Sequence, residues 1–277
     1  MKIIKSTGER VEYDPTKIRK TLLRTGADAK LVDRVIKRVS KRVTRDMATK
    51  RLFAIVRREL RRESRHLAQR YNLRNALIKL GPAGFKFEKY VSSILNAYEY
   101  KAHVPQKDLV GLCVNHEIDV IAEKDGRRMM IEAKFRNRFG DKVKLKDTMA
   151  TWARFVDLCD GSRKNKSCPH LDEVWIVTNG AFSDRSLQFG LCKGIDLVGW
   201  STKQHSLATL VDHASLYPIT VLDGLQQWEL DKFSDIGLML CREVATKSPG
   251  RLSGRTGMPR QRIANIIEQC KEVAGMG

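Results

Sequence analysis

Apolar positions along the first part of the chain recur at the spacing of helices, after an opening pair of short strands. The strands flank a Thr7-Gly8 turn, and Asp14-Pro15 then supplies the cap and the first residue of a helix that ends at Gly26. The same spacing predicts further helices over 29 to 43, 46 to 63 and 64 to 80. Because Gly81-Pro82 is a strong breaker, the pattern predicts a first domain over residues 1 to 80, a β-hairpin followed by helices.

From residue 82 onward, strand-like runs alternate with helical ones. The predicted elements are a helix over about 84 to 98, a strand ending at Val110, a hairpin over 117 to 135, a helix over 145 to 160, a polar loop over 161 to 167, and strands at 173 to 178 and 195 to 199 around a helix over 183 to 192. Such alternation is typical of an α/β domain with a mixed sheet. We therefore predict a multidomain α+β protein with a second domain over 82 to 215 and short helices over 218 to 277.

The hairpin is the most specific local signal, because two strand-like runs flank Asp125-Gly126. If these two residues form the turn, opposed residues have numbers that sum to 251. Asp119 then lies across from Glu132, and Glu117 lies across from Lys134. Alternation places Glu132 and Lys134 on one face of the sheet and their neighbours Ile131 and Ala133 on the other, apolar face.

Two opposed carboxylates repel each other unless a cation lies between them. Mg²⁺ prefers oxygen ligands, so Asp119, Glu132 and a backbone carbonyl are candidate ligands beside a scissile phosphodiester. Lys134 would then orient or deprotonate the attacking water and offset charge in the transition state. The alternative is a chance occurrence of this pattern in a chain with 30% charged residues.

These residues resemble a known family. The strings Ile118-Asp119-Val120-Ile121-Ala122 and Ile131-Glu132-Ala133-Lys134 are similar to the PD-(D/E)xK nuclease core of the Mrr-like restriction endonucleases. The resemblance spans about 82 to 213 and includes the strings Gly84-Phe85-Lys86-Phe87-Glu88, Val174 to Ser183 with Thr178-Asn179-Gly180, and Ile195 to Trp200. It implies a restriction-endonuclease-like fold, with Glu88, Asp119, Glu132 and Lys134 as catalytic residues. It also implies Mg²⁺ or Mn²⁺ bound by Glu88, Asp119 and Glu132.

Two features around this core have alternative interpretations. Glu117 is either an additional acidic ligand or the cross-strand ion-pair partner of Lys134. A run of cations follows the catalytic strand and either tracks a phosphate backbone or forms a solvated loop; it consists of Arg136, Arg138, Lys142, Lys144 and Lys146.

The first domain resembles an ATP-cone, a nucleotide-binding module. The similarity is carried by Ile3-Ile4-Lys5, Gly8, Glu12, Asp14, Lys17-Ile18, His66-Leu67-Ala68, Tyr71 and Arg74. It implies that ATP or dATP binds as a regulatory ligand, with phosphates held at a Gly turn flanked by cations. The implied nucleotide-binding residues are Lys5, Gly8, Arg10, Lys17 and Tyr71.

The stretch from Leu252 to Ile267 is similar to one half of a helix-hairpin-helix unit. In that motif, a Gly-containing turn presents backbone amides to a phosphate at the start of the second helix. Gly257 and Arg260 are therefore candidate DNA contacts. The alternative is a plain helical hairpin that contributes to packing.

The net charge of +20 is concentrated in the first domain. Residues 1 to 80 carry 24 basic and 8 acidic side chains, whereas 81 to 213 are nearly balanced. Such a surface favours a polyanion or is simply a solvated helical face. The short, interrupted apolar runs predict no membrane segment, and six cysteines without a CxxC pair favour a reducing cytoplasm.

The combined expectation is a Mg²⁺-dependent DNA endonuclease that a nucleotide on the cone regulates. DNA and nucleotide are the expected partners, and a homodimer is the expected assembly. The alternative is a nucleotide-responsive DNA-binding regulator without catalysis, in which the nuclease-like domain is a scaffold. A third interpretation makes the cone purely an oligomerisation or DNA-binding module.

Overall fold

The computed structural model describes residues 1–277 except Ser6, 82–84, Phe139, 165–169, Ser201, Gln204 and Gly277. Pro82 of the predicted breaker, Gly84 of the string before Glu88 and the polar loop beyond Lys164 lie outside the described residues. The chain forms two compact units. The first comprises Met1–Ala76, Tyr217–Leu230 and Cys241–Gly277, and the second comprises Leu77–Leu216 and Asp231–Leu240.

The first unit begins with the predicted hairpin. Strands β1 (Lys2–Ile4) and β2 (Arg10–Glu12) pair antiparallel, and Gly8 in their turn has φ +83°. A third strand, β3 (Met47–Ala48), pairs parallel with β1 and was not predicted. Two residues are too few to show a period in the sequence, so this strand depends on the pairing alone.

The helices of this unit follow the predicted order. They are α1 (Pro15–Arg24), α2 (Ala29–Ser40), α3 (Thr49–Glu63), α4 (Arg65–Tyr71) and α5 (Leu73–Ile78). The side chain of Asp14 accepts from the amide of Thr16, and Pro15 opens α1 as expected. The single helix predicted over 64 to 80 is wrong, because Asn72 separates α4 from α5 and its side chain accepts from Asn75. Asparagine competes with the helix for backbone and nearby polar groups in this way.

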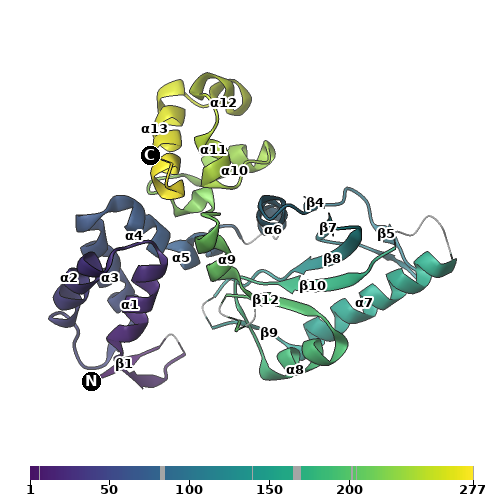
Figure 1. The fold of residues 1–277 in the computed structure, drawn as a ribbon, viewed down its shortest axis with the longest axis horizontal. Helices are drawn as coiled ribbons and strands as arrows, with labels where there is room; N and C mark the ends of the chain where they lie inside the picture. Colours follow the sequence, from purple (N-terminus) through teal and green to yellow (C-terminus); the bar gives the residue numbers. More distant parts are fainter. Residues whose placement is uncertain are drawn as a thin grey trace. The chain divides into compact units, whose positions relative to one another are not determined.

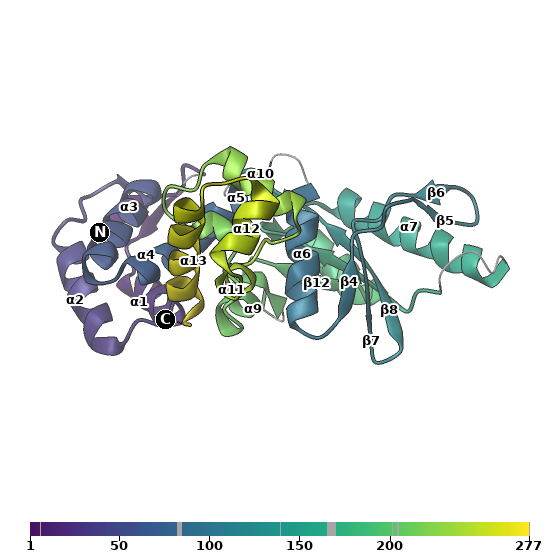
Figure 2. The same cartoon turned by 90° about the horizontal axis from the view of Figure 1, so that it is seen from above.

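The C-terminal helices belong to the same unit as the cone. They are α11 (Cys241–Ala245), α12 (Pro249–Thr256) and α13 (Arg260–Ala274), whereas the preceding α10 (Gln227–Asp235) has its first residues in this unit and Asp231–Asp235 in the second. Helix α13 packs beside α4, where the side-chain oxygen of Gln269 accepts from Arg65 at 3.0 Å and from Gln69 at 3.2 Å (Figure 2). The segments predicted as the first domain and as the C-terminal helices thus lie largely in one compact unit, in which side chains on α4 complete their hydrogen bonds with α13.

A six-stranded mixed sheet organises the second unit, in the order β13-β12-β10-β8-β7-β4. The strands are β4 (Lys101–His103), β7 (Val120–Lys124), β8 (Arg127–Ala133), β10 (Glu173–Val177), β12 (Asp196–Gly199) and β13 (His205–Ser206). The β4, β7 and β8 pairings are antiparallel, and those from β8 to β13 are parallel. Two small sheets accompany it, β5 (Leu109–Val110) with β6 (Asn115–His116) and β9 (Lys142–Val143) with β11 (Ala181–Phe182).

Helices cover both faces of this sheet. Helix α6 (Phe85–Ala97) lies on one face, α7 (Leu145–Lys164) and α8 (Asp184–Lys193) lie on the other, and α9 (Leu207–His213) follows β13 (Figure 1). Met130, on the same face of β8 as Glu132, is fully buried in the core beneath α7. The face that carries Glu132 is therefore covered as well, and only its end is polar. No helix in the described part of the chain is long and apolar enough to cross a membrane.

The β7–β8 hairpin has the predicted register. Lys124 lies opposite Arg127 and Val120 opposite Ile131, so opposed numbers sum to 251. Asp125 and Gly126 both have positive φ, at 52° and 75°, which is the backbone of a primed two-residue turn. The turn thereby decides which residues of the two strands face each other at the far end.

Replacing Gly126 with alanine tests the role of this turn. We expect Gly126→Ala to lower the free energy of unfolding by about 1 kcal/mol, because a Cβ is strained at φ +75° although nothing lies within 4 Å of it. Gly254→Ala is the control, since Gly254 lies inside α12 with similar open space and should gain stability. Urea denaturation followed by circular dichroism measures both, and equal effects would contradict the turn's role.

Candidate functional site

The carboxyl ends of the parallel strands place one group of polar residues together. Beyond β8, the amide of Lys134 donates to the carbonyl of Val177 at 2.8 Å, and the amide of Thr178 donates to Val198 at 2.8 Å. These bonds continue the ladder past the end of the strand. They hold the backbone of Lys134 in a defined position beside β10.

Asp119 and Glu132 approach this position from the two strands of the hairpin. Asp119 precedes β7, and its Oδ2 accepts the amide of Ala133 at 2.7 Å. Glu132 is the next-to-last residue of β8 and is only 3% exposed. The predicted register therefore brings the carboxyl of Asp119 to the end of the strand that carries Glu132.

Glu132 is a buried carboxylate held between two cations. Lys134 Nζ contacts its Oε1, and a guanidinium nitrogen of Arg154 contacts its Oε2. Arg154 lies in the middle of α7 and was missed by sequence reasoning. Its signal is its position on the stripe of buried residues Thr148, Thr151 and Leu158, where a cation needs a partner.

Glu88 adds a third carboxyl from the first turn of α6. Burial raises its pKa to about 7, helped by the charges of Asp119, Glu117 and Glu132. Burial, followed by the charge of Glu132, raises the pKa of Asp119 to about 6, although the amide of Ala133 and the cations Lys134 and Arg154 oppose this. The four predicted catalytic residues therefore share one electrostatic environment.

Glu117 is the exposed neighbour of this group. Sequence reasoning offered it as the cross-strand ion-pair partner of Lys134, but the ammonium of Lys134 contacts Glu132 instead. Glu117 acts on the site through its charge, which contributes to the raised pKa of Glu88.

The donors at this site suit a hard divalent cation, which prefers carboxylate oxygens. Two of the three carboxyls are desolvated and repel each other, and a cation would relieve both costs. Among the residues that the structure describes, no three His, Cys, Asp or Glu side chains stand together as a metal group. Both oxygens of Glu132 are instead engaged by Lys134 and Arg154.

The Thr178-Asn179-Gly180 turn braces the chain that follows Lys134. Thr178 Oγ1 donates to the carbonyl of Lys134 at 2.6 Å. Asn179 accepts the amide of Arg136 at 2.7 Å and donates to its carbonyl at 2.9 Å. A Cβ on Gly180 would lie 2.8 Å from the carbonyl oxygen of Asp141. The turn found by resemblance thus has a mechanical role, since it positions the backbone of both Lys134 and Arg136.

Most of the predicted DNA-binding cations beyond β8 gather around one cavity. A cavity of about 310 Å³ is lined by Arg136, Asp141, Lys142, Lys144, Lys146 and Asp147. Arg136 contacts Asp147 at 2.8 Å, which holds its guanidinium at the rim. Arg138 is exposed and is not among the lining residues. Four of the six lining residues are cations, so the cavity is a basic hollow of a kind that suits phosphate.

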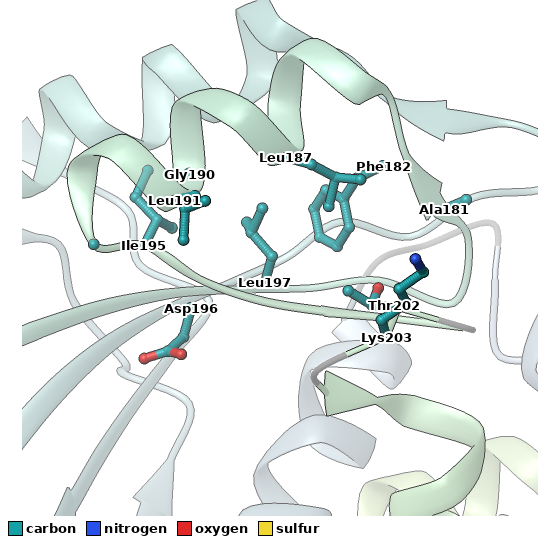
Figure 3. A pocket seen from close by; sticks show the side chains of 11 residues that line it. Ala181, Phe182, Leu187, Gly190, Leu191, Ile195, Asp196, Leu197, Thr202 and Lys203 are labelled. Atoms are coloured by element: carbon teal, nitrogen blue, oxygen red, sulfur yellow. The ribbon is translucent and has the colours of Figure 1, made fainter.

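A different cavity, of about 740 Å³, lies between α8 and β12 (Figure 3). Leu187, Leu191, Phe182 and Leu197 make its walls largely apolar, and the carboxylate of Asp196 points away from it. None of the four predicted catalytic residues lines this cavity. The hollow is thus separate from the acidic group.

In the cone, the predicted nucleotide-binding residues lie on three different elements. Lys5, Gly8 and Arg10 share the β1–β2 hairpin, where Lys5 contacts Glu9 at 2.8 Å and Arg10 contacts Asp46 at 3.2 Å. Lys17 is exposed on α1. Tyr71 instead stacks on Phe53 at 4.9 Å beside the helical core, and burial raises the pKa of its hydroxyl.

The C-terminal turn has the local geometry expected of it. Gly257 ends α12 with φ +70°, and Arg260 begins α13, both exposed. The side chain of Ser253 donates to the carbonyl of Met258 at 2.7 Å and closes the turn. This geometry is compatible with a plain helical hairpin as well as with a phosphate-binding turn.

Family models match two segments of the chain. The ATP cone family model matches residues 1–76, so the predicted ATP-cone is confirmed, and the model described as AF1548-like, C-terminal, matches residues 217–274. An uncharacterized protein of Archaeoglobus fulgidus is 36% identical over 166 residues, which cover 60% of this chain and 89% of that protein.

A solved structure extends this similarity. The crystal structure of AF1548, a protein of unknown function, matches with a TM-score of 0.57 and 32% identity, over 70% of this chain and 99% of that one. The chain is thus an ATP-cone protein of mixed α/β architecture. It belongs to the family of AF1548-like proteins.

The ion pair between Arg154 and the buried Glu132 predicts a stability effect. We expect Arg154→Gln to lower the free energy of unfolding by about 1–3 kcal/mol, because it withdraws one of two cations from a carboxylate with little access to water. Arg163→Gln, near the end of the same helix and paired with Asp160, is the control. The side chain of Arg163 is 77% exposed, so its loss should cost less than about 0.5 kcal/mol in urea denaturation. Equal costs would refute the role of Arg154.

Proposed function

We propose that the protein is a metal-dependent DNA endonuclease that hydrolyses phosphodiester bonds. The observation that carries the proposal is the pairing of the buried Glu132 with the backbone-anchored Lys134 at the end of β8, where Asp119 accepts the amide of Ala133 between them and Glu88 acts on the group through its charge. Carboxyls whose pKa is raised by burial and by neighbouring carboxylates, as at Glu88 and Asp119, are costly to a fold and are typical of functional sites. A restriction-endonuclease-like arrangement of the second unit is part of this proposal.

Asp119, Glu132 and Glu88 are the residues that would hold Mg²⁺ or Mn²⁺. Bound there, the ion would supply charge neutralisation at the phosphodiester and a more acidic water. For Glu132 to take part, at least one of its ion pairs has to open, and DNA phosphates are suitable competitors for Arg154 and Lys134.

In this proposal, Lys134 is the residue that would act on the reacting phosphate. Its side chain is 30% exposed, so it can reach a ligand while its backbone stays bonded to Val177 and Thr178. It would stabilise developing negative charge or orient the attacking water. Beside it, the basic cavity that Arg136, Lys142 and Lys144 help to form would hold the neighbouring phosphates.

A specific observation also favours a second candidate function. Because Lys134 and Arg154 already neutralise Glu132, the site is internally satisfied without a metal. That closed arrangement suits a nucleotide-responsive DNA-binding regulator in which the site is structural. Metal-dependent hydrolysis separates the two candidates.

Asp119→Asn is the variant that tests catalysis. It keeps the side-chain oxygen that accepts from Ala133 but removes the charge, so nicking of supercoiled plasmid with Mg²⁺ or Mn²⁺ should fall about 100-fold or more. Asp125→Asn is the matched control, because Asp125 lies in the exposed turn of the same hairpin and asparagine tolerates its φ of 52°. An Asp119→Asn protein as active as the wild type would sink the nuclease proposal.

The confirmed ATP-cone generates a prediction about nucleotide. ATP or dATP at about 1 mM should raise the melting temperature of the full chain by a few degrees, since a ligand that binds only the folded state stabilises it. The double variant Lys5→Ala with Arg10→Ala should reduce this shift, because both cations lie on the hairpin beside Gly8. Lys79→Ala, an exposed lysine outside the hairpin, is the control. An unchanged shift in the double variant would exclude the hairpin as the phosphate site.

A further inference from the structure

The first unit carries a dense array of arginines that the proposed nucleotide and nuclease sites do not use. We call the array the arginine ridge and define it by eight side chains grouped around three carboxylates. The ridge consists of Arg34, Arg38, Arg42, Arg57, Arg58, Arg61, Arg62 and Arg65, with Glu59, Glu63 and Asp223.

The sequence pattern of two helices creates the ridge. Helix α2 buries Leu31, Val32, Val35 and Val39, which leaves its basic residues on the outer face. Helix α3 packs beside α2 and buries Leu52, Ile55, Val56 and Leu60. Its later turns repeat pairs of arginines four residues apart, so that Arg57 and Arg61 both reach Asp223 while Arg58 and Arg62 both reach Glu59.

The carboxylates are too few to neutralise the arginines. Glu63 contacts Arg34 at 3.0 Å and Arg38 at 2.7 Å. The fully buried Glu59 lies 3.0 Å from Arg42, 3.1 Å from Arg62 and 4.0 Å from Arg58.

Asp223, from the segment 217–230 of the same unit, completes the array. It lies 2.7 Å from Arg57, 3.5 Å from Arg61 and 4.0 Å from Arg65. Eight positive charges thus meet three negative ones, and five remain uncompensated within the ridge.

The guanidiniums are both accessible and held in place. The side chains around Glu59 and Glu63 are between 40% and 58% exposed. Each guanidinium has five N–H donors, and one carboxylate engages at most two donors of the same guanidinium. The remaining donors are free for a ligand. Because the carboxylates already order the arginines, little side-chain entropy is left to lose on binding. A solvated, unstructured charge face has neither property.

We propose that the arginine ridge binds the phosphate backbone of duplex DNA, a role that rests on the proposed action on DNA. Arg34 and Arg38 are four residues apart on α2, which corresponds to about 6 Å along the helix axis, and Arg42 lies in the turn just after the helix ends. Such a row suits a line of phosphates rather than the compact triphosphate of one nucleotide. Arginine forks also match phosphate oxygens in bidentate fashion. The contact is independent of base sequence and adds affinity to the almost neutral second unit.

The test is a triple variant that weakens the ridge without orphaning a carboxylate. Arg34→Gln, Arg58→Gln and Arg61→Gln leave Arg38 on Glu63, Arg42 and Arg62 on Glu59, and Arg57 on Asp223. The charge-matched control combines Arg127→Gln, Arg128→Gln and Arg163→Gln in the second unit. The charge-retaining triple with lysine at the three ridge positions shows whether binding needs the charge alone.

Binding is measured by fluorescence anisotropy with a labelled duplex of about 25 base pairs, in EDTA and across a salt series. We expect the ridge triple to bind about 10–100-fold more weakly at 0.1 M salt and to reduce the slope of log K against log salt by about 2 to 3. The control triple should change both by much less, and the lysine triple should recover most of the affinity.

Three outcomes would overturn the proposal. The first is a ridge triple that loses no more affinity than the control while its circular dichroism and melting temperature match the wild type. The second is a ridge triple that loses affinity for a duplex RNA of the same length but not for the duplex DNA. The third is a loss of dATP stabilisation with unchanged DNA affinity. Binding is measured in EDTA, where metal-dependent cleavage cannot occur, so the two proposals fail separately. A protein that binds DNA through the ridge but cuts no DNA when Mg²⁺ or Mn²⁺ is supplied would refute the nuclease proposal and support the ridge proposal.

Discussion

The buried carboxylate of Glu132 is the constraint on which the centre of this protein depends. A carboxylate on a residue that is 3% exposed must be compensated, and the fold supplies Lys134 from just beyond the end of β8 and Arg154 from α7. Asp119 can join it only because the hairpin register is set by a two-residue turn at Asp125 and Gly126. The Thr178-Asn179 turn then holds the chain after Lys134. The β7–β8 register, the position of α7 and the Thr178-Asn179 turn thus all determine the surroundings of Glu132.

The two units treat charge in the same way at different scales. In the second unit, one buried carboxylate organises two cations, and in the first, three carboxylates organise eight arginines. Carboxylates thus act as anchors that fix the positions of an excess of positive groups. Such anchored cations are ready for phosphate, either at a proposed catalytic edge or along a proposed DNA-binding ridge. Most of the net positive charge of the chain therefore lies in the first unit, where carboxylates fix the positions of many of the cations.

Local rules predicted much of the fold. The Asp14-Pro15 helix start and the β7–β8 register were readable because each depends on a few neighbouring residues. The break at Asn72 and the strand β3 were missed, since the first interrupts a continuous helical pattern and the second spans two residues. The resemblance located the Thr178-Asn179 turn without its role. The ATP-cone was readable from scattered residues, and the family match confirms it.

Arg154 and the C-terminal helices show where the amino-acid sequence stops being sufficient. The periodicity of hydrophobic residues and the turn chemistry are local, so the chain itself specified its elements, the hairpin pairing and the placement of Asp119 across from Glu132. Two other features depend on residues far apart in the chain. One is the helix that supplies the second cation for Glu132, and the other is the completion of the hydrogen bonds of α4 by α13. Burial creates the need for those partners, and burial exists only once the helices and the sheet have packed.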